Sequence, residues 1–212
     1  MKYESVAREV AHHLLKIGAI KINLRRPYTW ASGWKSPIYC DNRLTLSYPE
    51  IRTYIKEELA NSIEKAYPNF EAIAGVATAG IPQGALVADI LNVPFIYVRS
   101  EPKGHGLENL IEGKVVRKQK VVVLEDLIST GGSSLKAASA LQAQGFNVLG
   151  MMAIFTYGFD IASDNFQNAK LPLTTLSNYA DMLHVAVEQK IVKEKDLLEL
   201  KSWRVDPVSW KK

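Results

Sequence analysis

The chain lacks several features that would direct a protein to an oxidising compartment, a membrane or a nucleic acid. It has one cysteine, Cys40, in 212 residues, so no disulfide can form within the chain and a reducing compartment is expected. Its first residues contain no apolar signal core, and no apolar run approaches the roughly 18 residues that a membrane span requires. The net charge of +4 is too small to indicate a nucleic-acid partner. We therefore expect a cytoplasmic protein with a small anionic substrate and neither a membrane nor a nucleic-acid partner.

The sequence also lacks the two common nucleotide-binding loops. No Gly-Lys-Ser/Thr follows its glycines as in a Walker A loop, and acids stand where a dinucleotide fingerprint has Gly-x-Gly. Residues 121–134, VVVLEDLISTGGSS, carry a different pattern. Four apolar residues, three of them β-branched, are typical of a strand that is buried on both faces of a parallel sheet. We expect Glu125 and Asp126 to follow this strand where it emerges from the sheet.

Each part of this stretch has a chemical meaning. A helix is expected from about residue 133, and its first turn offers unpaired N–H groups and a positive dipole end to a phosphate. Six residues with hydroxyl groups or no side chain lead into it: Ser129, Thr130, Gly131, Gly132, Ser133 and Ser134. The two carboxylates cannot face the same phosphate, so they are expected to face sugar hydroxyls or a metal. The alternative without function is an ordinary Ser/Gly helix cap that happens to follow two acids.

Alternating elements on either side of this stretch predict an α/β fold. Strands are expected at 72–76, 95–98, 121–124 and 148–155, with helices at 82–91 and 133–144 between them. Such units form a parallel sheet with helices on both faces, and ligands bind beyond the carboxyl ends of the strands. Residues 77–80, 99–113, 125–134 and 156–158 should therefore border one crevice. Further helices are expected at 4–17, from a capping box at 47–50, at 179–189 and at 192–203, and a hairpin is expected around Gly33.

Residues 99–113 form a long connection between two expected strands. Prolines and glycines argue against a helix, while Arg99, Lys103 and His105 give the connection positive charge. A loop of this length inside a compact domain is usually functional and often closes over a ligand. The alternative is a solvated hairpin whose charges have no role.

Together these motifs resemble a known family. Residues 121–134 resemble the PRPP-binding signature of type I phosphoribosyltransferases, PRPP being 5-phosphoribosyl 1-diphosphate. The Arg-x-x-x-Lys-x-His-Gly pattern at 99–106 resembles the mobile catalytic loop of orotate phosphoribosyltransferases, and 32–39 resembles their base-binding hood. The turn at 79–82 is similar to the family's Gly-Ile-Pro turn. The resemblance implies a type I phosphoribosyltransferase-like α/β fold, with a mostly parallel central sheet flanked by helices. It also implies an N-terminal helix and hood at 1–45, followed by a core with C-terminal helices at 46–212.

The same resemblance implies a pentosyltransferase that moves 5-phosphoribosyl from PRPP to orotate in pyrimidine (UMP) biosynthesis, giving orotidine 5′-monophosphate (OMP) and pyrophosphate. The implied catalytic residues are Lys103, Asp126, Arg99 and His105. The implied substrate-binding residues are Glu125, Ser129, Thr130, Gly131, Gly132, Ser133 and Ser134 for the ribose and its phosphate, Thr78, Ala79 and Gly80 for pyrophosphate, and Tyr39 and Lys35 for the base. The implied cofactor is Mg²⁺, held mainly by PRPP oxygens with Glu125 and Asp126 as further candidates. The implied assembly is a homodimer that shares the catalytic loop.

The chain departs from the family pattern at several positions. Ala31, Ala79 and Ser100 stand where many members have basic residues, and the arginine that binds the orotate carboxylate in many members is replaced near Tyr157. Either Lys35 or Arg43 could supply the missing charge. Two other functions therefore stay open: a type I phosphoribosyltransferase for a purine base, and a regulator that senses PRPP without catalysis.

Overall fold

A computed structural model describes residues 5–101 and 110–211. Its centre is a six-stranded sheet in the order β10-β9-β8-β5-β6-β7. The strands are β5 (Ala72–Val76), β6 (Phe95–Val98), β7 (Ile111–Glu112), β8 (Lys120–Ile128), β9 (Asn147–Thr156) and β10 (Leu173–Asn178). All neighbours pair in parallel except β7, which pairs antiparallel with β6. The expected mostly parallel α/β fold is thus confirmed.

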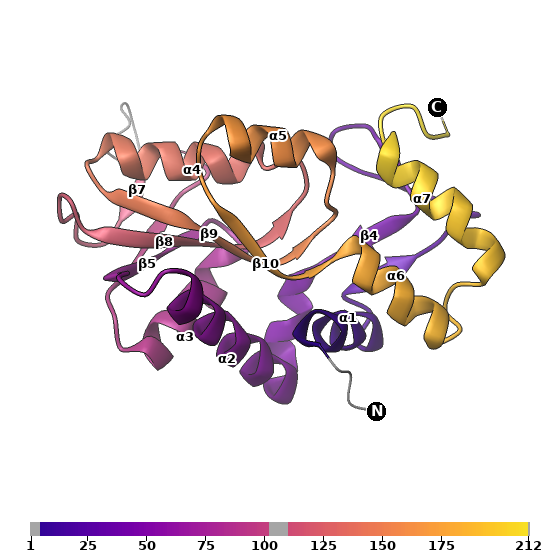
Figure 1. Cartoon of the computed structure of the whole chain (residues 1–212), viewed down its shortest axis with the longest axis horizontal. Helices are drawn as coiled ribbons and strands as arrows, with labels where there is room; N and C mark the ends of the chain where they lie inside the picture. The colour runs from indigo at the N-terminus through magenta and orange to yellow at the C-terminus, as the bar shows by residue number, and fades with distance from the viewer. Residues whose placement is uncertain (1–4, 102–109, 212) are drawn as a thin grey trace.

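Helices cover both faces of this sheet. Figure 1 shows α4 (Gly132–Ala143) and α5 (Asp160–Asn168) on one face, and α1 (Val6–Lys16), α2 (Pro49–Ala66) and α3 (Gly80–Leu91) on the other. Residues of β8 alternate between the two resulting core layers. Val122 and Leu124 lie in the layer with α1, α2 and α3, and Val121 and Val123 lie in the layer with α4 and α5. The apolar run is therefore buried on both faces, as expected.

The N-terminal segment forms two small antiparallel ladders, which we call the hood (residues 20–43). Strand β1 (Ile20–Ile22) pairs with β4 (Ile38–Cys40), and β2 (Tyr28–Thr29) pairs with β3 (Lys35–Ser36). Gly33 adopts φ of 85° at the tip of the second ladder, which confirms the expected hairpin. A 3₁₀ helix, η1 (Asn42–Ser47), joins the hood to α2.

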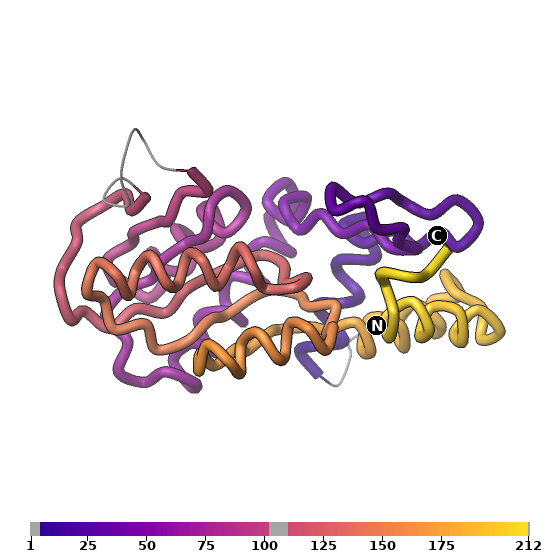
Figure 2. Tube along the Cα trace, turned by 90° about the horizontal axis from the view of Figure 1, so that it is seen from above, coloured from indigo at the N-terminus to yellow at the C-terminus, as the bar shows by residue number. Residues whose placement is uncertain are grey.

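The C-terminal segment lies beside the hood. It contains α6 (Tyr179–Glu188), the 3₁₀ turn η3 (Glu194–Asp196) and α7 (Leu197–Val205). Figure 2 shows the end of the chain next to the hood, far from the α4 end of the sheet. Within the described residues, no helix has both the length and the apolar character needed to cross a bilayer.

Three expectations about local structure were wrong. Strand β8 does not end before the acids, because its ladder with β9 continues through Glu125, opposite Ala153, to Ile128, opposite Thr156. The capping box is absent, since α2 begins after Tyr48 without a side-chain cap and Ser47 belongs to η1. The helix expected at 192–203 begins later, since α7 starts at Leu197 after the 3₁₀ turn η3. In addition, β7, β10 and α5 were not predicted.

Candidate active site

The loop from Ser129 to Gly131 connects β8 to α4, and α5 supports it from outside. Gly131 has φ of 78°, a conformation that side chains rarely adopt. A β-carbon there would lie 2.7 Å from Cε2 of Phe166, and the Asn165 amide donates a hydrogen bond to the Thr130 carbonyl at 2.9 Å. Two residues of α5 therefore hold the loop where its backbone can face a ligand. Ser129 and Thr130 are half-buried, and Gly132 and Ser133 are exposed.

Glu125 and Asp126 lie in the last part of β8, next to this loop. Glu125 is 7% exposed. It accepts hydrogen bonds from the Ser134 hydroxyl at 3.0 Å and from the Asp126 backbone N–H at 3.0 Å. Burial, and then the charge of Asp126, raise the pKa of Glu125 to about 8. Burial also raises the pKa of Asp126, against hydrogen bonding to Glu125 and the charge of Arg43. Ser134 is thus engaged with Glu125, unlike the exposed Ser133.

The hood reaches the acid pair through Asn42. This side chain is 1% exposed, and its amide donates to the Asp126 carbonyl at 2.7 Å. Its oxygen accepts from the Cys40 thiol at 3.3 Å. Sequence reasoning missed Asn42, because a single asparagine after a strand gives no signal of a contact 84 residues away.

The residues expected to meet the base lie on the hood. Tyr39 is 40% exposed, and its ring lies 5.6 Å from that of Tyr28. Arg43 donates to both carboxylate oxygens of Asp41, at 2.6 and 2.9 Å, and this pairing lowers the pKa of Asp41. Asp41 raises the pKa of Arg43 in turn, with smaller contributions from Tyr39 and Asp126. Lys35 instead donates to the Thr29 hydroxyl at 2.8 Å, across the hairpin.

The turn at residues 77–80 lies against the acid pair. The Ala77–Thr78 peptide bond is cis. Gly80 opens α3 so close to β8 that a β-carbon would lie 2.5 Å from the Leu124 carbonyl oxygen and 3.4 Å from the Glu125 Cα. Only glycine allows this approach. The structure thus brings together the 77–80 turn, the acid pair and the 129–131 loop, as the carboxyl ends of neighbouring parallel strands predict.

A cavity of about 880 Å³ opens at the carboxyl ends of β5 and β6 and runs along α4. Its lining includes Ala77, Arg99, Ser133 and Lys136. Arg99 pairs with Glu112 on the edge strand β7, with 3.2 Å between Nη1 and Oε1. Lys103 and His105, the other two expected loop residues, lie outside the described part of the chain.

Comparisons with known proteins agree with this arrangement. The family model described as "Phosphoribosyl transferase domain" matches residues 44–172. Orotate phosphoribosyltransferase of Cytophaga hutchinsonii is 60% identical to this chain over 205 residues, which are 97% of this chain and 98% of that protein. Orotate phosphoribosyltransferase of Bacteroides thetaiotaomicron is 56% identical over 207 residues, covering 98% of each chain. The chain belongs to the orotate phosphoribosyltransferase family.

A solved structure supports the same family at the level of the fold. The orotate phosphoribosyltransferase from Aeropyrum pernix superposes with a TM-score of 0.74 at 27% identity, over 86% of this chain and 99% of that chain. The phosphoribosyl transferase domain match begins and ends inside this chain. The match includes the 77–80 turn, the acid pair Glu125 and Asp126, and the 129–131 loop. It leaves out residues 1–43, which contain the hood, and residues 173–212, which contain α6 and α7.

Proposed function

We propose that the protein is an orotate phosphoribosyltransferase of pyrimidine biosynthesis, which converts PRPP and orotate to orotidine 5′-monophosphate and pyrophosphate. The observation that carries this proposal is the single strand–loop–helix unit in which two carboxyl groups stand beside a loop of hydroxyl and glycine residues. Few ligands other than a phosphorylated sugar need carboxyl groups for hydroxyls and a hydroxyl- and glycine-rich loop for a phosphate within one short segment of chain. Similarity to orotate phosphoribosyltransferases over nearly the whole chain gives the base and the reaction.

The 5′-phosphate binds at the start of α4. Backbone N–H groups of residues 129–134 and the hydroxyls of Ser129, Thr130 and Ser133 donate to its oxygens, because a helix start favours negative charge. Ser134 acts differently, since its hydroxyl already donates to Glu125 at 3.0 Å. Its role is to orient that carboxyl group.

Glu125 and Asp126 accept the 2′- and 3′-hydroxyls of the ribose and face its anomeric carbon. When the bond to pyrophosphate breaks, the sugar carries positive charge, and a nearby carboxylate stabilises that charge. Asp126 is the more accessible of the two acids, since it is half-buried while Glu125 is buried. Asn42 holds the Asp126 backbone, so the acid is presented from a fixed position.

Pyrophosphate leaves toward the turn at 77–80, where Thr78, Ala79 and Gly80 present backbone groups. Arg99, Lys103 and His105 from the catalytic loop neutralise its negative charge. A bound Mg²⁺ would supply Lewis-acid chemistry that offsets negative charge on the pyrophosphate. The residues present fit a metal held mainly by substrate, since Glu125 and Asp126 are adjacent carboxyl groups beside the loop and substrate phosphates commonly complete the ligands of Mg²⁺. Glu125 and Asp126 would supply the protein's oxygen ligands.

The base binds under the hood. Tyr39 presents an exposed ring on which a planar pyrimidine can stack. Lys35 and Arg43 are the two candidates for binding the orotate carboxylate. Without a ligand, Arg43 donates to both carboxylate oxygens of Asp41 and Lys35 donates to the Thr29 hydroxyl, so either side chain would have to exchange a partner to bind the base. The family's basic loop acts across a homodimer, so each site receives Lys103 from the partner subunit.

Orotate absorbance tests the proposal. On addition of PRPP and Mg²⁺ to the protein and orotate, we expect the orotate absorbance to fall while pyrophosphate accumulates. Turnover of adenine or guanine with no change in orotate would instead assign a purine phosphoribosyltransferase. PRPP binding without turnover of any base would assign a regulator.

A further inference from the structure

Helix α7 contacts the hood through two residues, Trp203 and Lys35, that lie 168 positions apart in the sequence. The Trp203 side chain is fully buried, and its indole N–H donates to the Lys35 carbonyl on β3 at 3.1 Å. Both segments lie outside the residues that match the phosphoribosyl transferase domain. The contact therefore joins two segments that the phosphoribosyl transferase domain match does not cover.

Trp203 is also the centre of an aromatic cluster. Its ring lies 5.7 Å from Trp30, 5.7 Å from Tyr157 and 5.4 Å from Phe159, each at a steep interplanar angle. Edge-to-face pairs of this kind add stability beyond the burial of area. Trp30 in turn donates its indole N–H to the Ile38 carbonyl at 3.2 Å. Trp203 thus holds β3 directly and β4 through Trp30.

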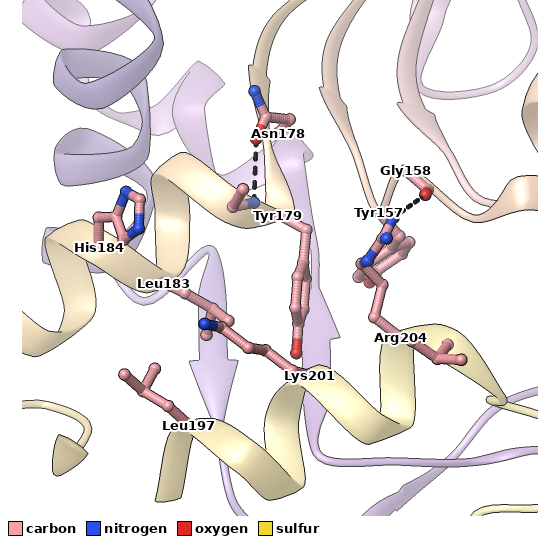
Figure 3. A pocket seen from close by; sticks show the side chains of 11 residues that line it. Tyr157, Gly158, Asn178, Tyr179, Leu183, His184, Leu197, Lys201 and Arg204 are labelled. Carbon is pink, nitrogen blue, oxygen red and sulfur yellow. Dashed lines mark hydrogen bonds between the residues drawn. The ribbon is translucent and has the colours of Figure 1, made fainter.

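Other contacts join α7 and the tail that follows it to the same side of the molecule. Arg204 donates a hydrogen bond to the Gly158 carbonyl at the end of β9, and Lys211 donates to the Leu24 carbonyl of the hood at 2.7 Å. A cavity of about 550 Å³ lies between α6 and α7, and Gly158 and Arg204 are among the residues that line it. Figure 3 shows this cavity, with Leu183 and His184 of α6 across from Leu197 and Lys201 of α7. Helix α7 also contacts α6 directly, since the Tyr179 ring lies 5.6 Å from the Trp203 ring.

The segment from Lys35 to Asn42 is held at both ends. At one end the Trp203 indole N–H donates to the Lys35 carbonyl. At the other end the Asn42 amide donates to the carbonyl of Asp126, one of the two acids proposed to hold the ribose. Ser36 stiffens the segment, since its hydroxyl donates to the Ile38 carbonyl at 2.7 Å and accepts from the Ile38 N–H at 3.0 Å. Tyr39 lies between the two attachments, with its ring exposed.

We propose that Trp203 is a positioning residue for base recognition. Its hydrogen bond to the Lys35 carbonyl sets the position of Tyr39 on the hood relative to the acid pair, Glu125 and Asp126. This inference rests on the proposed function, because it assigns the exposed face of the hood to the base. It predicts that loss of the bond affects orotate more than PRPP, whose sugar and phosphates bind to β8, α4 and the 77–80 turn.

The test compares Trp203→Phe with Tyr179→Phe. Trp203→Phe keeps an aromatic ring and removes the bond to the hood. Tyr179→Phe removes a buried bond to the same helix, from the Tyr179 hydroxyl to the Leu200 carbonyl at 2.9 Å, without touching the hood. Losing one neutral hydrogen bond corresponds to a factor of about five to ten. For Trp203→Phe we expect the KM for orotate to rise by about that factor, with kcat and the KM for PRPP unchanged. For Tyr179→Phe we expect no selective change in the KM for orotate.

Amide hydrogen exchange provides a readout that does not need turnover. We expect residues 28–40 to exchange faster in Trp203→Phe than in the wild type, and at the wild-type rate in Tyr179→Phe. An unchanged orotate KM with unchanged hood exchange in folded Trp203→Phe would overturn the proposal, as would an equal rise in both KM values. A wild-type protein that consumes no orotate would contradict the proposed function instead, and the exchange comparison would still decide whether Trp203 positions the hood.

Discussion

Glu125 is a carboxyl group that the fold both buries and places next to a second acid. Its two hydrogen-bond donors, the Ser134 hydroxyl and the Asp126 backbone N–H, lower its pKa. Burial and the charge of Asp126 raise the pKa by more. In the site without substrate, burial and the neighbouring acid therefore favour the protonated form of Glu125. In the proposed reaction, cationic charge on the ribose would favour the ionised form of this group.

The raised pKa predicts a specific dependence of stability on pH. The folded protein retains the Glu125 proton above the ordinary pKa of 4.5, whereas the unfolded chain loses it there. Between pH 4.5 and about 8 the folded state thus binds more protons, so raising the pH through this window lowers the free energy of unfolding. A single proton can change the free energy of unfolding by at most about 1.4 kcal/mol per pH unit. Glu125→Gln has no proton to lose and should reduce this slope.

Denaturant unfolding at several pH values from 5 to 8 measures the effect. The wild type and Glu125→Gln should differ in slope, with the variant gaining stability relative to the wild type as the pH rises. Glutamine keeps the size of the side chain, and its one carbonyl oxygen can accept one of the two hydrogen bonds that the Glu125 carboxyl group accepts from Ser134 and Asp126. Parallel slopes for the two proteins would show that Glu125 is already ionised in the folded state.

The loop between β8 and α4 offers a matched pair of glycines. At Gly131 a side chain would meet both a left-handed backbone and Phe166, whereas at Gly132 a β-carbon would have only the Thr130 hydroxyl within 4 Å, at 3.9 Å. Gly131→Ala should lower the free energy of unfolding by about 1–2 kcal/mol from the backbone conformation alone, with a further loss if Phe166 must move. Gly132→Ala should leave it unchanged or slightly higher, since alanine favours a helix start. Thermal unfolding compares the two, and equal losses would contradict the assignment of strain to Gly131.

At the scale of elements, the sequence predicts the buried strands and helices better than the edge strands of the sheet and the ends of the elements. The apolar run at 121–124 is buried as expected, because a run of apolar residues indicates a strand that is covered on both faces. In α2, Ile51, Ile55, Leu59 and Ile63 recur at helical spacing and are likewise buried. The edge strands β7 and β10 are short or rich in polar residues, so no apolar run marks them. The extension of β8 through its two acids depends on pairing with β9, which local propensity cannot reveal.

The candidate site shows the same division. The sequence predicted that Glu125, Asp126, the 129–131 loop and the 77–80 turn lie close together, since each is a short motif that the topology of a parallel sheet places at the same edge. The roles of Asn42 and Trp203 could not be predicted, because both depend on contacts that are distant in the sequence. Asn42 contacts Asp126, 84 residues away, and Trp203 contacts Lys35, 168 residues away. Nothing near either residue in the sequence distinguishes such a contact from an ordinary buried side chain.

At the scale of the whole molecule, segments from the two ends of the chain contact each other beside residues 44–172, which match the phosphoribosyl transferase domain. Besides the contacts of Trp203 and Lys211 with the hood, the Ser177 hydroxyl at the end of β10 donates to the Ala7 carbonyl of α1 at 2.7 Å. The residues that match the phosphoribosyl transferase domain contain the proposed PRPP-binding groups, while the two terminal segments surround the proposed base site. Changes in the termini should therefore alter the choice of base before they alter PRPP binding.

The proposed sharing of the catalytic loop is a property of the assembly, and two inactive chains can test it. Lys103→Ala should reduce turnover by about 10²–10³, the scale for losing one electrostatic contact in the transition state, and Asp126→Asn should impair the ribose site. If the loop crosses the dimer, a heterodimer of the two variants has one site with both changes and one intact site. An equal mixture that reassorts freely should then recover about a quarter of the wild-type activity, because half of its dimers are mixed and each has one good site of two. Verified heterodimers with no recovery would mean that each chain closes its own site.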